Sequence, residues 1–202
     1  MSDLIIYDCA QNSPEWMEAR RGIPTASRFA DVLAKGQGVT RRKYLLTLAG
    51  EIMTGECVDS YSNDHMERGH AMEDDARRMY AFLRDVEPLP VGFMRRGRVG
   101  ASPDSLIGED GILEIKTKLP HLHLDCLERN RLPPEHVAQV QGQLLVSGRQ
   151  FCDFVSYWPR MPLFHTRVER DQAYIDNIEK EVGVFLAELD AIVAKYSTGE
   201  AA

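Results

Sequence analysis

The 202-residue chain lacks several patterns that would define a class of protein. Its four cysteines are scattered and form no C-x-x-C pair, which argues against a disulfide scaffold or a structural zinc site and fits a reducing compartment. No apolar run approaches the about 20 residues that span a bilayer, and the first residues lack the basic and apolar regions of a signal peptide. A G-x-x-x-x-G-K-[ST] motif is also missing, so an ATP-driven activity is unsupported. These absences predict a cytoplasmic protein without a membrane partner.

Acidic residues outnumber basic ones, 31 to 24, and the net charge of −7 taken alone argues against a nucleic-acid-binding protein. The charges are unevenly distributed, however. Residues 20–43 hold seven basic side chains and one acid, whereas residues 169–202 hold eight acids and three bases. The basic segment is either a local positive field for an anionic partner or an ordinary solvated helix face.

The length suits one domain, and no repeat, low-complexity tract or linker divides the chain. We expect a single domain over residues 1–202, with a helical part over 1–85, a sheet core over 86–170 and a C-terminal helix over 171–202. Turn residues and short β-like runs predict strands at 91–94, 98–102, 105–107, 112–117, 151–158 and 163–168. The order of elements predicts an α/β fold with a central mixed β-sheet flanked by helices.

Helices are expected from residue 14, over 25–35, 40–55 and 63–85, from Pro133 to residue 146, and over 171–196. Residues 120–134 are interpreted as a loop, and Trp16 as a core side chain. In the 63–85 helix, an inward stripe of large apolar side chains is predicted at Met66, Met72, Met79 and Phe82.

The most informative segment is residues 101–118, ASPDSLIGEDGILEIKTK. Alternation along a strand places Glu114 and Lys116 on one face, with Ile115 pointing into the core. The turn-like residues 109–111 predict a hairpin that brings Asp104 opposite that face. Two carboxylates and one ammonium would then converge at the end of a sheet.

This set suits metal-assisted hydrolysis of a phosphodiester, because Mg²⁺ prefers oxygen ligands and retains several waters. Asp104, Glu114 and the backbone carbonyl of Ile115 are the candidate ligands for one or two ions. Lys116 is the candidate for orienting or deprotonating the attacking water, or for neutralising charge on the phosphate. The same residues also fit a surface salt bridge between Glu114 and Lys116 beside a turn at Asp104.

Three histidines have open roles. His121 and His123 alternate in the expected loop, but no cysteine or second histidine pair joins them, which disfavours a zinc site. His136 lies near the start of the expected helix that follows Pro133 and either faces the site or is a hydrogen-bonded rim residue.

Four blocks of sequence occur in one order between residues 16 and 161. They are WMEARRGIPTAS (16–27), RGHAMEDDAR (68–77), SPD with LEIK (102–104 and 113–116), and AQVQ with YWPRM (138–141 and 157–161). Together they resemble the YqaJ-like viral recombinase family, the lambda-exonuclease-like group of PD-(D/E)xK nucleases. Ser105 departs from the resemblance, which has glycine at that position, and Thr117-Lys118 departs from its Cys-Pro.

The resemblance implies a restriction-endonuclease-like core and a role for each matching residue. Asp104, Glu114 and the Ile115 carbonyl match metal ligands, and Lys116 matches the catalytic lysine. The implied cofactor is Mg²⁺, as two ions, with Mn²⁺ able to substitute. Further catalytic residues are implied at Glu73, an acid borne on a helix near the metals, and at Gln141, an amide that lines the active site. Positions that bind the DNA or its 5′ phosphate match Arg20, Thr25, Ser27 and Ser102.

The implied activity is an ATP-independent 5′–3′ exonuclease that digests linear double-stranded DNA, releases mononucleotides and leaves a 3′ single strand for phage-type recombination. The implied assembly is a ring-shaped homotrimer, and the implied partner is a phage single-strand annealing protein in a bacterial host. Two alternatives remain at this point. One is an endonuclease of the same fold, and the other is a non-catalytic scaffold that binds DNA ends.

Overall fold

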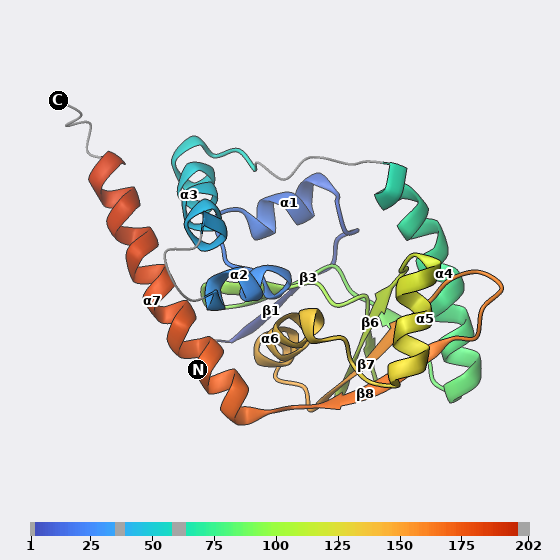
Figure 1. Cartoon of the computed structure of the whole chain (residues 1–202). Helices are drawn as coiled ribbons and strands as arrows, with labels where there is room; N and C mark the ends of the chain where they lie inside the picture. The colour runs from blue at the N-terminus through green and yellow to red at the C-terminus, as the bar shows by residue number, and fades with distance from the viewer. Residues whose placement is uncertain (1–2, 35–38, 58–63, 198–202) are drawn as a thin grey trace.

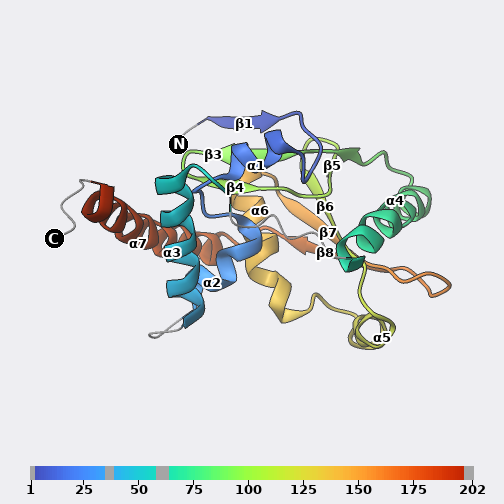
Figure 2. The same cartoon turned by 90° about the horizontal axis from the view of Figure 1, so that it is seen from above.

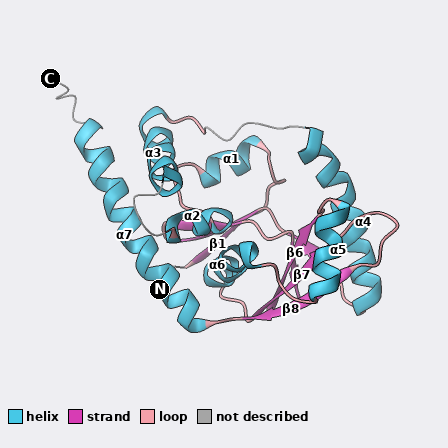
Figure 3. Ribbon diagram, in the orientation of Figure 1, coloured by secondary structure: helices cyan, strands magenta, loops and turns pink. Residues whose placement is uncertain are grey.

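The computed structural model describes residues 3–34, 39–57 and 64–197, without the side chains of residues 64–71. Two sheets lie at the centre, with helices packed around them (Figures 1 and 3). The larger sheet has the order β2 (Leu89–Pro90), β5 (Ser105–Ile107), β6 (Gly111–Lys116), β7 (Phe151–Ser156) and β8 (Phe164–Glu169). The smaller sheet has the order β1 (Leu4–Tyr7), β3 (Phe93–Arg96) and β4 (Val99–Ala101).

Seven α-helices surround the sheets in the part of the chain that is described. They are α1 (Pro14–Arg20), α2 (Phe29–Leu33), α3 (Val39–Thr54), α4 (Asp64–Arg84), α5 (Pro120–Arg129), α6 (Val137–Ser147) and α7 (Gln172–Ser197). Short 3₁₀ turns precede α2, at Ala26–Arg28, and α6, at Pro134–His136. Helices α3 and α7 lie together at one end of the molecule, and α4 and α5 lie at the other (Figures 1 and 2).

Strand β6 is the centre of the larger sheet. It pairs antiparallel with β5 and parallel with β7, whereas the remaining pairs are antiparallel, so the expectation of a mixed sheet flanked by helices is confirmed. Its side chains alternate between two layers. Leu113 and Ile115 pack with Ala76 and Tyr80 of α4, while Ile112 joins the main core with α6 and α7. Glu114 and Lys116 therefore share the face that is covered by α6.

Helix α6 lies close against the segment that leads into α2, because residue 142 is glycine. A Cβ atom added to Gly142 would lie 2.4 Å from the Phe29 ring and 3.1 Å from the Ala26 Cβ. This close packing brings residues 25–29 beside the helix that covers the Glu114 face of β6.

Helix α4 covers the opposite face of the sheet and differs from the prediction in its inward residues. Ala76 and Tyr80 are buried, whereas Met79 is 39% and Phe82 is 86% exposed. The predicted stripe is therefore wrong at these two positions, although Met72 does pack at the cluster edge. The side chain of Met66 lies outside the described residues.

Besides the two-residue strand β2, two elements have no counterpart in the prediction. Strand β1 is a short edge strand that pairs with β3, and its central Ile5 and Ile6 are half exposed, so it shows no buried run that would mark a strand. Helix α5 occupies much of the expected 120–134 loop: it starts with Pro120 in its first turn and ends at Asn130, which has a left-handed φ of 46°. In the described ranges, no helix is both long and apolar enough to cross a membrane.

Candidate active site

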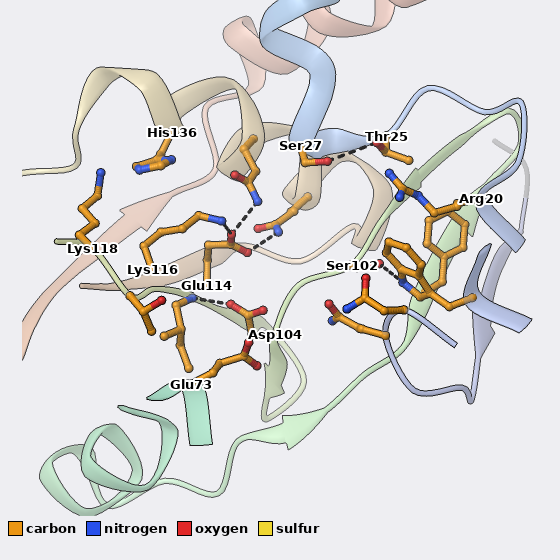
Figure 4. A pocket seen from close by; sticks show the side chains of 18 residues that line it. Arg20, Thr25, Ser27, Glu73, Ser102, Asp104, Glu114, Lys116, Lys118 and His136 are labelled. Atoms are coloured by element: carbon orange, nitrogen blue, oxygen red, sulfur yellow. Dashed lines mark hydrogen bonds and ion pairs between the residues drawn. The ribbon is translucent and has the colours of Figure 1, made fainter. Parts of the chain in front are cut away.

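The β5–β6 hairpin brings Asp104 beside Glu114. The Asp104 N–H donates to the Leu113 carbonyl at 3.0 Å, and its carboxylate Oδ2 accepts from the Ile115 N–H at 2.5 Å. Because Asp104 is hydrogen-bonded to the backbone of the residues on both sides of Glu114, the two acids are held at the same position along β6. The predicted convergence of Asp104, Glu114 and Lys116 is observed (Figure 4).

Glu114 is 2% exposed, and both of its carboxylate oxygens accept hydrogen bonds. Oε1 accepts from Lys116 Nζ and from Gln139 Nε2, each at 2.6 Å, and Oε2 accepts from Gln143 Nε2 at 2.6 Å. Gln139 and Gln143 are four residues apart on α6 and so lie on the same face of the helix. A buried carboxylate with three donors is fixed in orientation.

Gln141 does not line this site, so its predicted position is wrong. Its Nε2 donates to the Glu169 carbonyl at 2.9 Å, and its Oε1 accepts from the Asp171 N–H at 2.9 Å. In a helix with 3.6 residues per turn, residue 141 faces away from residues 139 and 143. Helical periodicity fixes this relation among the three glutamines but does not show which face meets Glu114.

Glu73 reaches the same cavity from α4, as the resemblance implies. Its side chain is 23% exposed, and its Oε1 accepts from Arg77 Nη2 at 2.5 Å. The cavity thus has three carboxylates, from Glu73, Asp104 and Glu114.

Burial and neighbouring charges shift the pKa values of Asp104 and Lys116. Burial raises the pKa of Asp104 well above its usual range, and the negative charges of Glu114 and Glu73 raise it further. Burial lowers the pKa of Lys116, but the neighbouring Glu114 and Asp104 outweigh it and raise that pKa overall. The Lys116 ammonium is paired with Glu114, with 2.6 Å between Nζ and Oε1.

The predicted DNA-binding residues lie on another side of the same cavity, and Trp16 joins them. The Arg20 guanidinium lies 4.3 Å from the centroid of the Trp16 ring, and the Trp16 Nε1–H donates to Ser102 Oγ at 2.8 Å. The hydroxyls of Thr25 and Ser27 are 3.3 Å apart. Trp16 is 9% exposed, as a core residue would be, but it also holds two candidate phosphate ligands.

Other basic residues of the 20–43 segment are engaged elsewhere. Arg28 pairs with Asp31, and Arg41 forms a bidentate pair with Glu188 of α7 at 2.7 and 3.0 Å. Arg20 differs from both because it lines the cavity. The uneven charge of the sequence therefore serves both helix packing and the candidate site.

A cavity of about 520 Å³ contains the acidic and basic groups together (Figure 4). Lys118 and His136 line it on the side of the acids away from Arg20. Burial and the charges of Lys118 and Lys116 lower the pKa of His136 to about 4, so this imidazole is neutral at physiological pH.

The other two candidate histidines, His121 and His123, do not line the cavity. His123 is buried in α5, where Nδ1 is 2.8 Å from Ser156 Oγ and Nε2 is 2.9 Å from the Pro162 carbonyl. His121 is exposed. Both ring nitrogens of His123 are thus occupied by structural partners.

The donor set fits a hard divalent cation. Three carboxyl groups offer oxygen ligands beside one ammonium, and Mg²⁺ is typically bound by one or two carboxylates together with water. Among the side chains that are described, no group of three or more His, Cys, Asp or Glu is placed to hold a metal ion by itself. Gln143 Oε1 is buried and has no hydrogen-bond partner among these residues, so it is available to a metal-bound water.

The mixed sheet, its flanking helices and this acidic cavity define a protein of the restriction-endonuclease-like fold. The sequence profile of the YqaJ-like viral recombinase domain matches residues 15–150, and the chain belongs to this family.

Solved structures agree with this assignment. The chain is 38% identical to an alkaline exonuclease (LHK-Exo) from Laribacter hongkongensis, over 92% of this chain and 97% of that one, with a TM-score of 0.85. The structure of LHK-Exo in complex with dAMP gives 39% identity, coverage of 91% and 95%, and a TM-score of 0.84. A phage related exonuclease from Haemophilus somnus 129PT shares the fold at 12% identity, with coverage of 86% and 96% and a TM-score of 0.66. No match was found among curated proteins.

Proposed function

We propose that the protein is a Mg²⁺-dependent, ATP-independent 5′–3′ exonuclease on linear double-stranded DNA. It releases mononucleotides and leaves a 3′ single-stranded overhang for phage-type homologous recombination by single-strand annealing. One observation carries the proposal: a single cavity holds the Asp104, Glu114 and Lys116 cluster together with Arg20, Ser27 and Ser102. A metal-binding centre and an anion grip in one cavity suit cleavage next to a terminal phosphate.

The proposed cofactor is a pair of Mg²⁺ ions, for which Mn²⁺ can substitute. When bound, the ions would activate water and stabilise charge on the scissile phosphate. Asp104, Glu114 and the Ile115 carbonyl would hold them. Gln139 and Gln143 keep the Glu114 carboxylate in place, and the Lys116 ammonium neutralises charge on the phosphate. Glu73 faces the same space and orients the attacking water.

Arg20 provides the preference for a phosphorylated end. A guanidinium binds phosphate bidentately, and its stacking on Trp16 limits the side-chain freedom that binding would otherwise remove. Thr25, Ser27 and Ser102 contribute hydroxyls to the same grip. The complex of the related LHK-Exo with dAMP, a deoxymononucleotide, supports a mononucleotide as the released product.

The wider assignments follow the family resemblance. We propose a homotrimeric ring that encloses duplex DNA, which would explain processive digestion without ATP and would confine the positive potential to a channel through an acidic protein. The partner would be a phage single-strand annealing protein, and the setting the cytoplasm of a bacterial host. Light scattering tests the ring directly, since a trimer has three times the mass of the 22.9 kDa chain.

The decisive assay compares a linear 5′-phosphorylated duplex with a covalently closed circle, each with Mg²⁺ and with EDTA. The proposal predicts loss of the linear DNA alone, and only with Mg²⁺. Cleavage of the circle would instead indicate an endonuclease of the same fold. Binding of ends without cleavage of either substrate would indicate a non-catalytic scaffold.

A further inference from the structure

Arg77 of α4 connects the two segments that carry two of the site's acids. Its Nη2 donates to Glu73 Oε1 at 2.5 Å, and its Nε donates to Ser105 Oγ at 3.0 Å. The Ser105 hydroxyl in turn donates to the Asp104 carbonyl at 2.6 Å. One planar guanidinium therefore spans from the Glu73 carboxylate to the residue next to Asp104.

Burial makes this link specific. The Arg77 side chain is 16% exposed and Ser105 is fully buried, whereas the neighbouring Arg78 is 76% exposed and pairs with the exposed Asp75. The third contact of Arg77, from Nη1 to Asp74 at 2.5 Å, leads to solvent. A largely buried guanidinium that donates to fixed partners holds its acceptors more rigidly than an exposed ion pair such as Arg78–Asp75 does.

Attachment of α4 to the sheet does not depend on Arg77 alone. Tyr80 Oη donates to the buried Asp153 of β7 at 2.5 Å, and Asp153 also accepts from Arg167 at 2.8 Å. Ala76 and Tyr80 pack against Leu113 and Ile115. Because these contacts hold α4 against the sheet without Arg77, the hydrogen bonds of Arg77 can act mainly on the orientation of Glu73.

We propose that Arg77 is a positioning residue that fixes the Glu73 carboxylate relative to Asp104. This inference rests on the proposed nuclease function. The hydroxyl of Ser105, where the family resemblance has glycine, adds a bond to the bridge in this chain. Removal of the guanidinium would withdraw its hydrogen bond from Glu73 Oε1 and its link to Ser105, while the Tyr80 and Ala76 contacts of α4 stay in place.

The test compares Arg77→Ala and Arg77→Lys with Arg78→Ala as the matched control. For Arg77→Ala we expect kcat to fall about 10- to 100-fold, the range for groups that orient the carboxylates of a metal site. Arg77→Lys should be intermediate because one ammonium cannot reproduce the fork. Arg78→Ala should be unchanged. Calorimetric titration with Mn²⁺ should show weaker binding by Arg77→Ala and unchanged binding by the control.

Two further readouts separate positioning from a merely structural role. A second cavity of about 370 Å³ is lined by Arg77, Glu73 and Asp104, so free guanidinium ion has access and should partly restore the Arg77→Ala rate. On a Glu73→Gln background, adding Arg77→Ala should cost less than about twofold, since coupled residues are non-additive.

The outcomes distinguish the two proposals. If the unaltered protein leaves linear duplex intact, the proposed function fails. If the unaltered protein is active and Arg77→Ala is equally active, the positioning role fails. The role also fails if guanidinium gives no rescue and the full loss persists on the Glu73→Gln background.

Discussion

The acidic and basic sides of the cavity are built in different ways. On the acidic side, Glu114 has three donors at 2.6 Å, and Asp104 accepts from the backbone of β6. On the basic side, Arg20 lies against an aromatic face, and the nearby hydroxyls come from short turns and strand ends. The ligands of the proposed cation would require the first kind of precision. A phosphate grip tolerates the second.

The difference also appears in the parts of the chain that contribute. The hairpin over residues 104–116 supplies most of the acidic side, and α6 locks it through Gln139 and Gln143. The basic side comes from residues 16–27 and from Ser102, which meet because Gly142 permits close packing and Thr25 bridges to Gly100 of β4. Substitutions on the acidic side should therefore abolish cleavage. Substitutions on the basic side should instead change the preference for one kind of DNA end over another.

The largest effect is expected at the candidate metal ligands. Asp104→Asn and Glu114→Gln should each lower kcat by about 10³-fold or more, because a bound metal supplies several kcal/mol of transition-state stabilisation. Single-turnover rates on 5′-phosphorylated duplex measure this loss, with circular dichroism as the control for folding. Activity within tenfold of the unaltered protein in either variant would refute the ligand assignment.

A smaller effect should separate two neighbouring glutamines of α6. Gln143→Leu frees one oxygen of Glu114 and should lower kcat about 10- to 100-fold. Gln141→Leu should leave kcat unchanged but destabilise the fold by about 2 kcal/mol, because it removes both hydrogen bonds from the buried Gln141 side chain to the backbone of residues 169 and 171, each worth about 1 kcal/mol. Kinetics and urea unfolding of both variants check the pair, and the reverse pattern would restore Gln141 to the active site.

On the basic side, substrate choice should change more than rate. Arg20→Ala should reduce the preference for a 5′ phosphate over a 5′ hydroxyl about tenfold, the value of a charge-assisted hydrogen bond. Trp16→Leu should act in the same direction and less strongly, through loss of the stack. The ratio of kcat/KM on the two ends is the measurement, and an equal loss on both ends would show that Arg20 is not the phosphate grip.

The smallest effect concerns stability and His136. Its folded pKa of about 4 lies below the value near 6.5 of an unfolded histidine, so the unfolded chain binds more protons between these limits. Stability is complete above pH 6.5 and falls with pH, by about 2 kcal/mol between pH 7 and pH 5. His136→Phe keeps the aromatic contact with Phe154 and should lose less over this range. Denaturant unfolding at both pH values checks it, and equal losses would exclude His136.

The sequence predicts the acidic side well because its geometry is local. Strand alternation and a three-residue turn are enough to join Asp104, Glu114 and Lys116. The choice among three glutamines depends on how α6 is rotated against the sheet, which is a tertiary property. Met79 and Phe82 mislead for a similar reason: apolar residues predict an inward face, but Ala76 and Tyr80 occupy it.

Other parts of the site depend on contacts between distant segments. Trp16 meets Ser102 across 86 residues, and Arg77 meets Ser105 across 28, so neither role is visible in a local pattern. Helix α5 cannot be predicted from an apolar periodicity, because its buried residues, His123 and Cys126, are weak markers of an apolar face.

The central claim is that one cavity joins metal-assisted hydrolysis to recognition of a 5′-phosphorylated end. The most direct measurement uses a duplex with one 5′-phosphorylated strand and one strand blocked at its 5′ end, with products resolved by mass spectrometry over time. The account predicts 5′ mononucleotides from the phosphorylated strand in step with its shortening, while the blocked strand stays at full length. Shortening from the 3′ end, or release of internal oligonucleotides, would contradict it.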